Sequence, residues 1–439
     1  MLMPLLSEAD PKTSTEGSVD PLGLYSIADS LGTLLVPGIR ERQAHPRFLT
    51  SIAVSHLVCA DFSEDALAKD GISEPWQVFE WTLVEGMVRT AGDPGQLRGL
   101  PGQDKARRAL EDNLHLSARR YLKNPGVVGF HGVYRLLARD LGVERAERLG
   151  DFGYELVSTW EKEQGLTGFT GTLNGKGRDI RRQLYEAVLD GMEKGSVARS
   201  KGWSGFQFFT QHLDIRDAGR NEARLIVRRL LDPSGGFRGE VLKCLTSPDG
   251  KQLWSRQWEE KSLFERRFHE LLAKSASQGL KVLLNAIGIY EEFSRLLQDA
   301  FDECMVCLSK GQKRLHAAKL ASLESVKRAT KKIPEIFNKV AEQLSPISNG
   351  QHFQEAFRDL ADRLPVAEWV ERLLEHHCKV QRKKPPAGKA PWFDRFDDGS
   401  YMIRTAYLRE GSVPMDDRYV HAYRTRSLWS FAQDLGLVK

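Results

Sequence analysis

The chain has 439 residues, of which 41% are hydrophobic and 28% are charged, and these proportions are typical of a globular protein with a large core. No stretch reaches the roughly 18 consecutive apolar residues that a membrane span requires. The first residues lack the basic and long apolar segments of a signal peptide. We therefore expect a cytoplasmic protein without membrane contacts. The net charge of +5 favours an acidic partner without requiring one.

Residues 1–20 are polar and typical of a flexible leader. Apolar residues at helical spacing then predict a helix that ends at Pro37-Gly38 and a second helix over about 46–59. The turn between these helices carries Arg40, Glu41, Arg42, Gln43, His45 and Arg47. Its basic residues could together bind a phosphate or a carboxylate. Alternatively, they cap the helix ends and pair with Glu41 and Asp29.

Several short helices joined by tight turns are expected in the N-terminal half. One follows a Gly-rich turn near residue 129 and carries Arg135 and Arg139 on its outward side. Short helices with basic residues resemble a helix-turn-helix or winged-helix arrangement. A plain helical bundle produces the same pattern and is the commoner explanation.

The most basic part of the chain extends from Ser309 to Val340, and we expect it to be helical apart from a kink or break at Pro334. Few acidic residues offset its charge. A charge run is usually a solvated face, but the low acid content makes phosphate contact a strong alternative. The residues predicted here to bind nucleic acid are Lys310, Lys313, Arg314, Lys319, Lys327, Arg328, Lys331 and Lys332.

A second basic segment, residues 381–392, is rich in proline and is expected to be extended rather than helical. The remaining predicted nucleic-acid contacts are Arg382, Lys383, Lys384, Lys389, Arg40, Arg42, Arg135 and Arg139. Residues 393–405 follow, where alternating apolar residues around Asp398-Gly399 predict a β hairpin. A last helix is expected over about 426–435.

The five cysteines are too few and too unevenly spaced for a disulfide framework, so we expect reduced thiols. A zinc site could combine Cys304, Cys307, His376, His377 and Cys378. These two groups are far apart in the sequence, and neither lies on the tight turn of a zinc knuckle. Buried structural thiols are the preferred interpretation, and we predict no metal or other cofactor.

No compact catalytic motif is present, because the sequence lacks His-Glu-x-x-His, Gly-x-Ser-x-Gly, a Walker lysine and His-Asn-His spacing. A nuclease would have to use scattered residues. The candidates for such a role are His45, His56, Asp61, Asp232, Glu240 and His377. We therefore assign no catalytic residue.

Two parts of the chain resemble an uncharacterised bacterial domain family whose genes tend to lie beside phage-defence and mobile-element genes. The first is Leu22–Gly38, which reads LGLYSIADSLGTLLVPG, with the Arg-Phe pair that ends at Phe48. The second is residues 377–392, from HCKVQ to GKAPW, with the hairpin that follows. No catalytic residue of that family can be transferred, so the resemblance implies a setting and not a mechanism.

We expect a mainly α protein with a helical N-terminal lobe at 21–204, a long-helix lobe at 205–375 and a C-terminal segment at 376–439. A winged-helix-like arrangement is one option for the centre of the first lobe. The leading hypothesis is a non-catalytic component of a bacterial phage-defence system that binds DNA, RNA or other subunits through basic helices. The alternatives are a metal-dependent nuclease subunit of such a system and a helical scaffold that docks an acidic protein.

Overall fold

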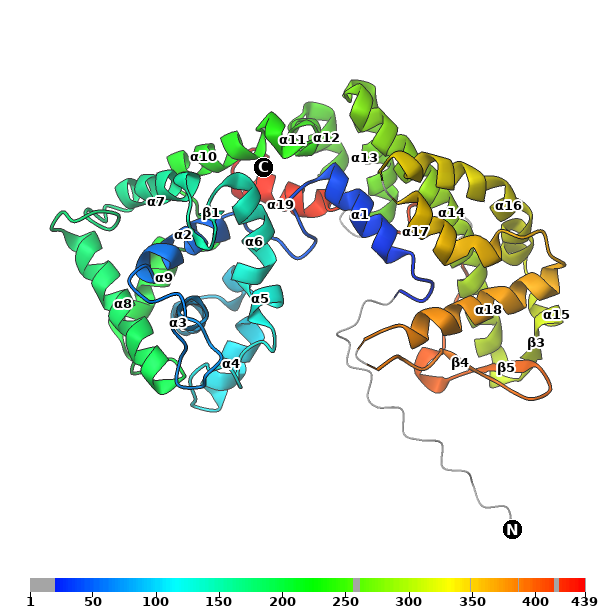
Figure 1. The fold of residues 1–439 in the computed structure, drawn as a ribbon, viewed down its shortest axis with the longest axis horizontal. Coiled ribbons are helices and arrows are strands. Elements are labelled where there is room, and N and C mark those ends of the chain that lie inside the picture. Colours follow the sequence, from blue (N-terminus) through cyan, green and yellow to red (C-terminus); the bar gives the residue numbers. More distant parts are fainter. Residues whose placement is uncertain (1–19, 256–260, 348, 386, 414–417, 439) are drawn as a thin grey trace, which may run out of the picture. The chain divides into compact units, whose positions relative to one another are not determined.

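Helices dominate the computed structural model of the protein, and the predicted mainly α fold is confirmed (Figure 1). Among the described residues, β structure is confined to a two-stranded and a three-stranded sheet. None of the helices described is long and apolar enough to span a bilayer. The structure describes residues 20–255, 261–347, 349–385, 387–413 and 418–438.

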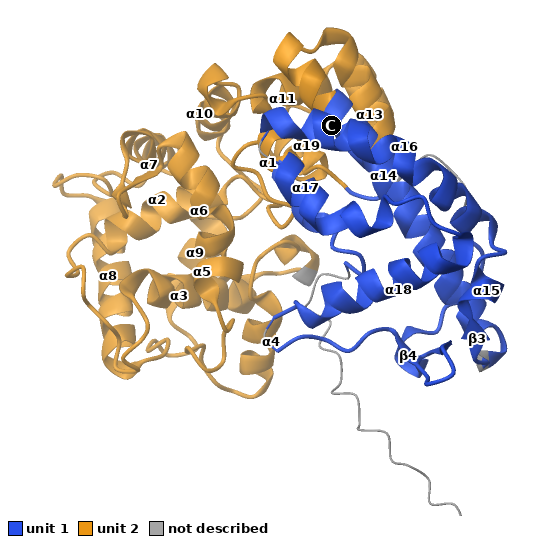
Figure 2. Ribbon diagram, turned by 45° about the vertical axis from the view of Figure 1, so that its right-hand side comes forward, with its two compact units in different colours: residues 1–30, 285–421 blue, residues 31–284, 422–439 orange. Residues whose placement is uncertain are grey.

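The chain divides into two compact units, and each unit is discontinuous in sequence (Figure 2). Unit 1 comprises residues 1–30 and 285–421, and unit 2 comprises residues 31–284 and 422–439. The chain passes between the units within α1 (Tyr25–Leu35), within α14 (Gln278–Ser309) and after residue 421. These divisions differ in position from the lobe boundaries expected at residues 204 and 375.

In unit 2, the helix α2 (Phe48–Val58) is apolar on nearly all sides and therefore buried, as expected for a helix surrounded by others. The unit's strands β1 (Glu144–Arg145) and β2 (Arg148–Leu149) form one short antiparallel ladder. The α-helices are α2 Phe48–Val58, α3 Pro75–Thr90, α4 Gln103–Glu111, α5 Pro125–Val128, α6 Phe130–Leu141, α7 Asp151–Glu163, α8 Lys176–Lys194, α9 Gln207–His212, α10 Arg220–Leu230, α11 Arg238–Thr246, α12 Pro248–Trp254, α13 Lys261–Ser275 and α19 Thr425–Asp434. The 3-10 helices are η1 Pro94–Leu97, η2 Ser204–Phe206 and η3 Pro233–Gly235.

Unit 1 packs helices beside a small antiparallel sheet with the strand order β3-β5-β4. The predicted hairpin is present as β4 and β5, where Phe393 pairs with Ile403. A third strand comes from far earlier in the chain, because Leu315 pairs with Tyr401. The other elements are α15 Ala317–Leu320, α16 Glu324–Leu344, α17 Gly350–Phe357, α18 Val366–Arg382, β3 Leu315–His316, β4 Phe393–Arg395, β5 Ser400–Ile403, η4 Lys310–Gln312, η5 Ser345–Ile347, η6 Arg358–Leu360 and η7 Thr405–Tyr407.

The expectation of a helix over 309–340 broken at Pro334 is wrong. The helical run stops instead near Gly311, whose φ of 75° does not fit a helix, and β3 follows. The helix α16 then continues through Pro334. A proline inside a helix costs about 3 kcal/mol, and the buried apolar residues on both sides of it, from Val326 to Leu344, stabilise α16 enough to offset that cost.

One buried ion pair fixes the start of α2 in unit 2. Arg47 is almost fully buried and contacts both carboxylate oxygens of Glu222, at 3.3 and 3.4 Å. Two further N–H groups of Arg47 donate to the carbonyls of His212 and Asp214, at 3.0 and 2.7 Å. The Thr50 hydroxyl donates to Glu222 at 2.5 Å. Arg47 is thus a structural residue and not a free cation at the turn.

We predict that Glu222→Gln destabilises unit 2 by about 3–5 kcal/mol, because it leaves the Arg47 charge buried without a counter-ion. Urea unfolding followed by tryptophan fluorescence measures the loss. The matched control is Glu186→Gln, which removes an exposed partner of Arg182 at 3.9 Å and should change the free energy of unfolding by less than about 0.5 kcal/mol. Equal effects of the two variants would contradict the prediction.

Candidate nucleic-acid interface

The helix α16 carries the core of the predicted basic surface, and its amphipathic pattern decides which side chains reach solvent. Its apolar side is buried within unit 1, where the Phe337 ring lies 6.5 Å from Phe293 and 5.0 Å from Phe353, centroid to centroid. The opposite side is exposed and carries Lys327, Lys331, Lys332 and Lys339. The helix is therefore a fixed support for a row of lysines.

The cations of α16 differ in whether a carboxylate neutralises them. Lys327 pairs with Glu324 at 2.9 Å. Arg328 turns toward the interior and meets Asp299 at 2.5 Å, and Arg295 binds the same carboxylate at 2.8 Å. In contrast, none of the carboxylates that the structure describes forms an ion pair with the three other lysines. These unpaired side chains are Lys331, Lys332 and Lys339.

The segment before α16 adds further exposed cations. Lys310, Lys313 and Lys319 are exposed, and within the described ranges they make no ion pair. Arg314 is also exposed, and its guanidinium carbon lies 3.5 Å from the ring centroid of Phe396 in the β4–β5 turn. The β3–β5 pairing brings these two residues together across the sequence.

The second basic segment is folded back on itself and is not extended, which corrects the expectation for residues 381–392. The helix α18 continues to Arg382, and the N–H of Lys389 donates to the carbonyl of Gln381 at 2.9 Å. Arg382, Lys383 and Lys389 are exposed. Lys384 is half-buried, and burial lowers the pKa of its ammonium group. The segment thus presents three exposed cations at the end of α18.

Arg40 and Arg42 lie in unit 2, on a turn held rigidly by side chains distant in sequence. Arg238 donates to the carbonyl of Pro37 at 2.8 Å, and Arg424 donates to the carbonyl of Ile39 at 2.7 Å. Gly38 has a φ of 77°, and a Cβ there would lie 2.9 Å from the Leu137 side chain. Both turn arginines are exposed, and no ion pair involves either of them in the part of the chain that is described.

The histidine of the same turn is structural. The Nδ1 atom of His45 lies 2.6 Å from a carboxylate oxygen of Asp434, and its Nε2 atom lies 2.7 Å from the carbonyl of Arg98. Both neighbours are hydrogen-bond acceptors, so both bonds form when both ring nitrogens carry hydrogen. The predicted four-residue basic cluster therefore separates into two exposed arginines and two buried residues, His45 and Arg47.

Arg135 and Arg139 both form ion pairs with carboxylates of unit 2. Both bind Glu144, at 3.2 and 2.8 Å, and both also lie within ion-pair distance of Glu147. Burial would raise the pKa of Glu144, but hydrogen bonds from His56, Arg139 and Arg135 outweigh it and lower that pKa to about 2. These two arginines thus already have counter-ions within unit 2.

The scattered candidates for nuclease chemistry do not assemble into one site. Asp232 accepts hydrogen bonds from Ser234 of its own turn, at 2.9 and 2.8 Å. Glu240 binds the N–H and hydroxyl of Ser277, both at 2.8 Å. His56 lies 3.5 Å from Glu144, Asp61 is exposed, and His377 belongs to the other unit. Across the described ranges, no group of three or more potential ligands could hold a metal ion.

The residues of the considered zinc site have other roles in unit 1. The Nδ1 atom of His377 donates to the carbonyl of Pro21 at 2.9 Å, while its Nε2 atom accepts from the N–H of Trp392 at 3.1 Å. The Nε2 atom of His376 donates to the carbonyl of Leu22 at 2.8 Å. Cys304 is fully buried, and burial raises the pKa of its thiol, so it remains protonated.

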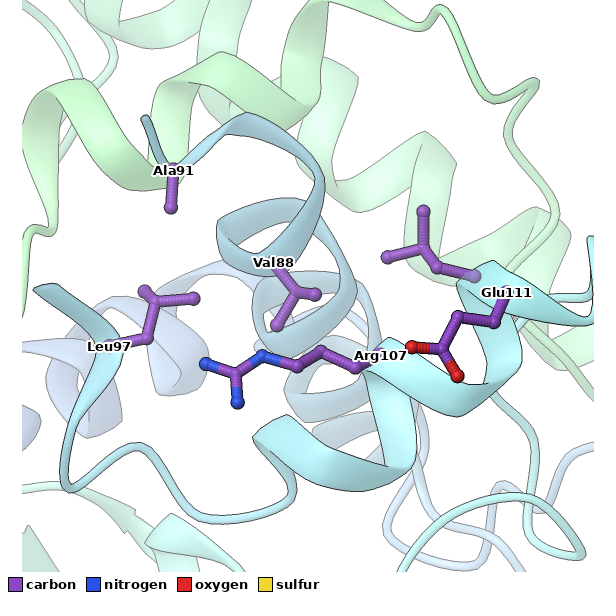
Figure 3. A pocket seen from close by; sticks show the side chains of 6 residues that line it. Val88, Ala91, Leu97, Arg107 and Glu111 are labelled. Atoms are coloured by element: carbon purple, nitrogen blue, oxygen red, sulfur yellow. The ribbon is translucent and has the colours of Figure 1, made fainter. Parts of the chain in front are cut away.

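A surface pocket of about 260 Å³ lies in unit 2, between α3 and α4 (Figure 3). Its apolar lining includes Val88, Ala91 and Leu97, and its two charged residues, Arg107 and Glu111, both come from α4. Arg107 also reaches Gln103 at 3.2 Å. The lining residues that the structure describes include no serine, cysteine or histidine, and Glu111 is their one carboxylate.

Comparison with known proteins identifies no relative, since no protein-family model, no curated protein and no solved structure matches the chain. The functional argument therefore depends on the geometry of the charged side chains.

We predict that unit 1 becomes less stable as the pH falls below about 6.5, because of His377. Burial, followed by the nearby charges of Lys384 and His376, lowers the pKa of His377 from 6.5 to about 4. The unfolded chain therefore binds a proton before the folded chain does, and stability that is complete above pH 7 is lost between about pH 6.5 and pH 4. His377 alone should remove about 2 kcal/mol between pH 7 and pH 5.

Urea unfolding of the wild type and of His377→Gln at both pH values tests this. The variant is expected to be less stable at pH 7, since it loses at least one backbone hydrogen bond, but to lose less on acidification. An undiminished loss in the variant would assign the pH dependence to other groups. His376, whose pKa burial also lowers, is the first of these.

Proposed function

We propose that the protein is a non-catalytic component of a bacterial phage-defence system that binds nucleic acid through the basic surface of unit 1. The observation that carries this proposal is the set of exposed lysines that form no ion pair with a carboxylate of the described residues. They are Lys310, Lys313, Lys319, Lys331, Lys332 and Lys339. Exposed cations on a rigid support attract the phosphate backbone and release its counter-ions, which is the main source of sequence-independent binding.

The lysines of α16 are spaced so that two of them can contact two different phosphates of one strand. Lys332 and Lys339 are seven residues apart on a continuous helix, so their α-carbons are separated by about 11 Å along the axis. They lie on nearly the same side, because seven residues make almost two complete turns. One α16 face can thus contact successive phosphates of a strand.

The phage-defence setting is supported by the resemblance of residues 22–38 and 377–392 to a family found beside such genes. A non-catalytic role is the simplest interpretation of how the candidate catalytic residues are placed. His45, Asp232 and Glu240 lie in unit 2, whereas His377 lies in unit 1. Each of them forms hydrogen bonds with residues outside this candidate set.

We predict that Lys331→Gln/Lys332→Gln weakens binding to labelled oligonucleotides and reduces the salt dependence of that binding. Because each phosphate contact contributes about 0.9 to the slope of log K against log salt for duplex DNA, the double variant should reduce the slope by up to about 1.8. Fluorescence anisotropy between about 50 and 200 mM salt measures both effects.

The matched control is Lys274→Gln/Lys281→Gln, which removes the same charge from exposed positions of unit 2 and should leave affinity and slope nearly unchanged. If both double variants act alike, only the net charge matters and the α16 surface is not the site. If the wild type binds no oligonucleotide but captures an acidic protein through Lys331 and Lys332, the scaffold alternative replaces the proposal. Cleavage of plasmid DNA with Mg²⁺ would contradict a non-catalytic role.

A further inference from the structure

The guanidinium of Arg314 lies very close to the aromatic ring of Phe396, which carries no net charge. The guanidinium carbon lies 3.5 Å from the centre of the ring, and the other cation–π contacts described are longer, at 4.8 Å or more. At this separation the planar guanidinium lies flat against one face of the ring. Its other face is directed away from Phe396.

The outer face and the donors of Arg314 are available. The side chain is exposed, and it makes no hydrogen bond or ion pair with any residue in the described part of the chain. Asp398, in the same hairpin turn, accepts hydrogen bonds from the N–H and hydroxyl of Ser400, at 2.9 and 2.5 Å, and the positive charge of Arg314 acts on its carboxylate without a hydrogen bond between them. Arg314 thus presents a planar guanidinium, held in place by Phe396, whose N–H groups form no hydrogen bond with the described residues.

Two exposed lysines precede Arg314 in the sequence. Lys313 precedes Arg314 directly, Lys310 lies four residues before it, and both are exposed and form no ion pair with the residues that the structure describes. The hairpin carboxylate of Asp394 is neutralised by Arg404 at 2.8 Å. These two lysines belong to the same exposed segment as Arg314 and add to its positive charge.

We propose that Arg314, supported by Phe396, is a stacking platform for an unpaired base, so that unit 1 prefers single-stranded nucleic acid. This inference rests on the proposed function and names its substrate class. Unpaired bases stack on arginine planes and aromatic rings, whereas a duplex keeps its base faces inside the helix. The lysines of α16 supply affinity for any phosphate backbone, and Arg314 distinguishes a single strand from a duplex.

The test measures the affinity of the full chain for a short unstructured DNA strand, the RNA of the same sequence, and the DNA duplex. Arg314→Lys keeps the charge but removes the plane. It should weaken binding to the single strands about five-fold or more, with an unchanged salt slope and unchanged duplex affinity. Phe396→Leu should act in the same direction, because it removes the ring that holds the guanidinium flat.

The matched control is Arg395→Lys, in the same sheet. Arg395 is also exposed, but its guanidinium lies 6.0 Å from the Tyr401 ring, so this variant should bind like the wild type. Unfolding midpoints of all three variants verify that the sheet is intact. The inference is overturned if Arg314→Lys and Phe396→Leu bind single strands as tightly as the wild type, or if the wild type binds duplex at least as tightly.

These results separate the two proposals. Loss of binding in Lys331→Gln/Lys332→Gln together with full binding in Arg314→Lys would refute the platform and retain the phosphate surface. An absence of binding to every oligonucleotide would refute the proposed function, and the platform with it. The comparison of the DNA strand with the RNA strand shows whether the protein binds deoxyribose-containing or ribose-containing strands more tightly.

Discussion

Side-chain donors from distant parts of the sequence hold two backbone stretches near the start of the chain. In unit 2, Arg238 and Arg424 bind the carbonyls of the turn before α2. In unit 1, the side chains of His377, His376 and Tyr290 donate to the carbonyls of Pro21, Leu22 and Leu24, respectively. Buried carbonyls need such partners, since an unsatisfied one costs about 1–3 kcal/mol. In each unit, residues from later in the sequence thus supply the hydrogen-bond donors for the buried carbonyls of a stretch near the start of the chain.

This constraint explains why basic residues in the same turn have different roles. A guanidinium or imidazole that reaches a buried carbonyl or carboxylate becomes part of the core, as Arg47 and His45 do. One for which the described residues offer no such neighbour stays exposed, as Arg40 and Arg42 do. The same distinction separates Arg328, which pairs with Asp299, from the lysines beside it. The cations available to a ligand are those that the interior does not use.

The sequence predicted the helical class, the helix α2 and the C-terminal hairpin, because each has a local signature in periodicity or turn residues. It did not predict β3, since two residues form a strand only through pairing with Tyr401 and its neighbour. For the same reason Phe396 was missed as a partner of Arg314, although its place in a turn beside Asp398-Gly399 was evident. The ion pairs of Arg135 and Arg139 with Glu144 also depend on tertiary packing, while the low acid content around α16 was visible in the sequence.

The interleaving of the two units determines the order in which they can form during synthesis. Unit 1 begins with the segment ending at residue 30 but needs residues 285–421, and unit 2 is interrupted by that same stretch before α19 arrives. The ring of Trp429 in α19 stacks on Trp254 at 6.0 Å, so the unit 2 core is incomplete until then. Chains with such non-local contacts fold slowly and expose apolar surface meanwhile. A ribosome-bound chain of this protein therefore carries two unfinished cores at once.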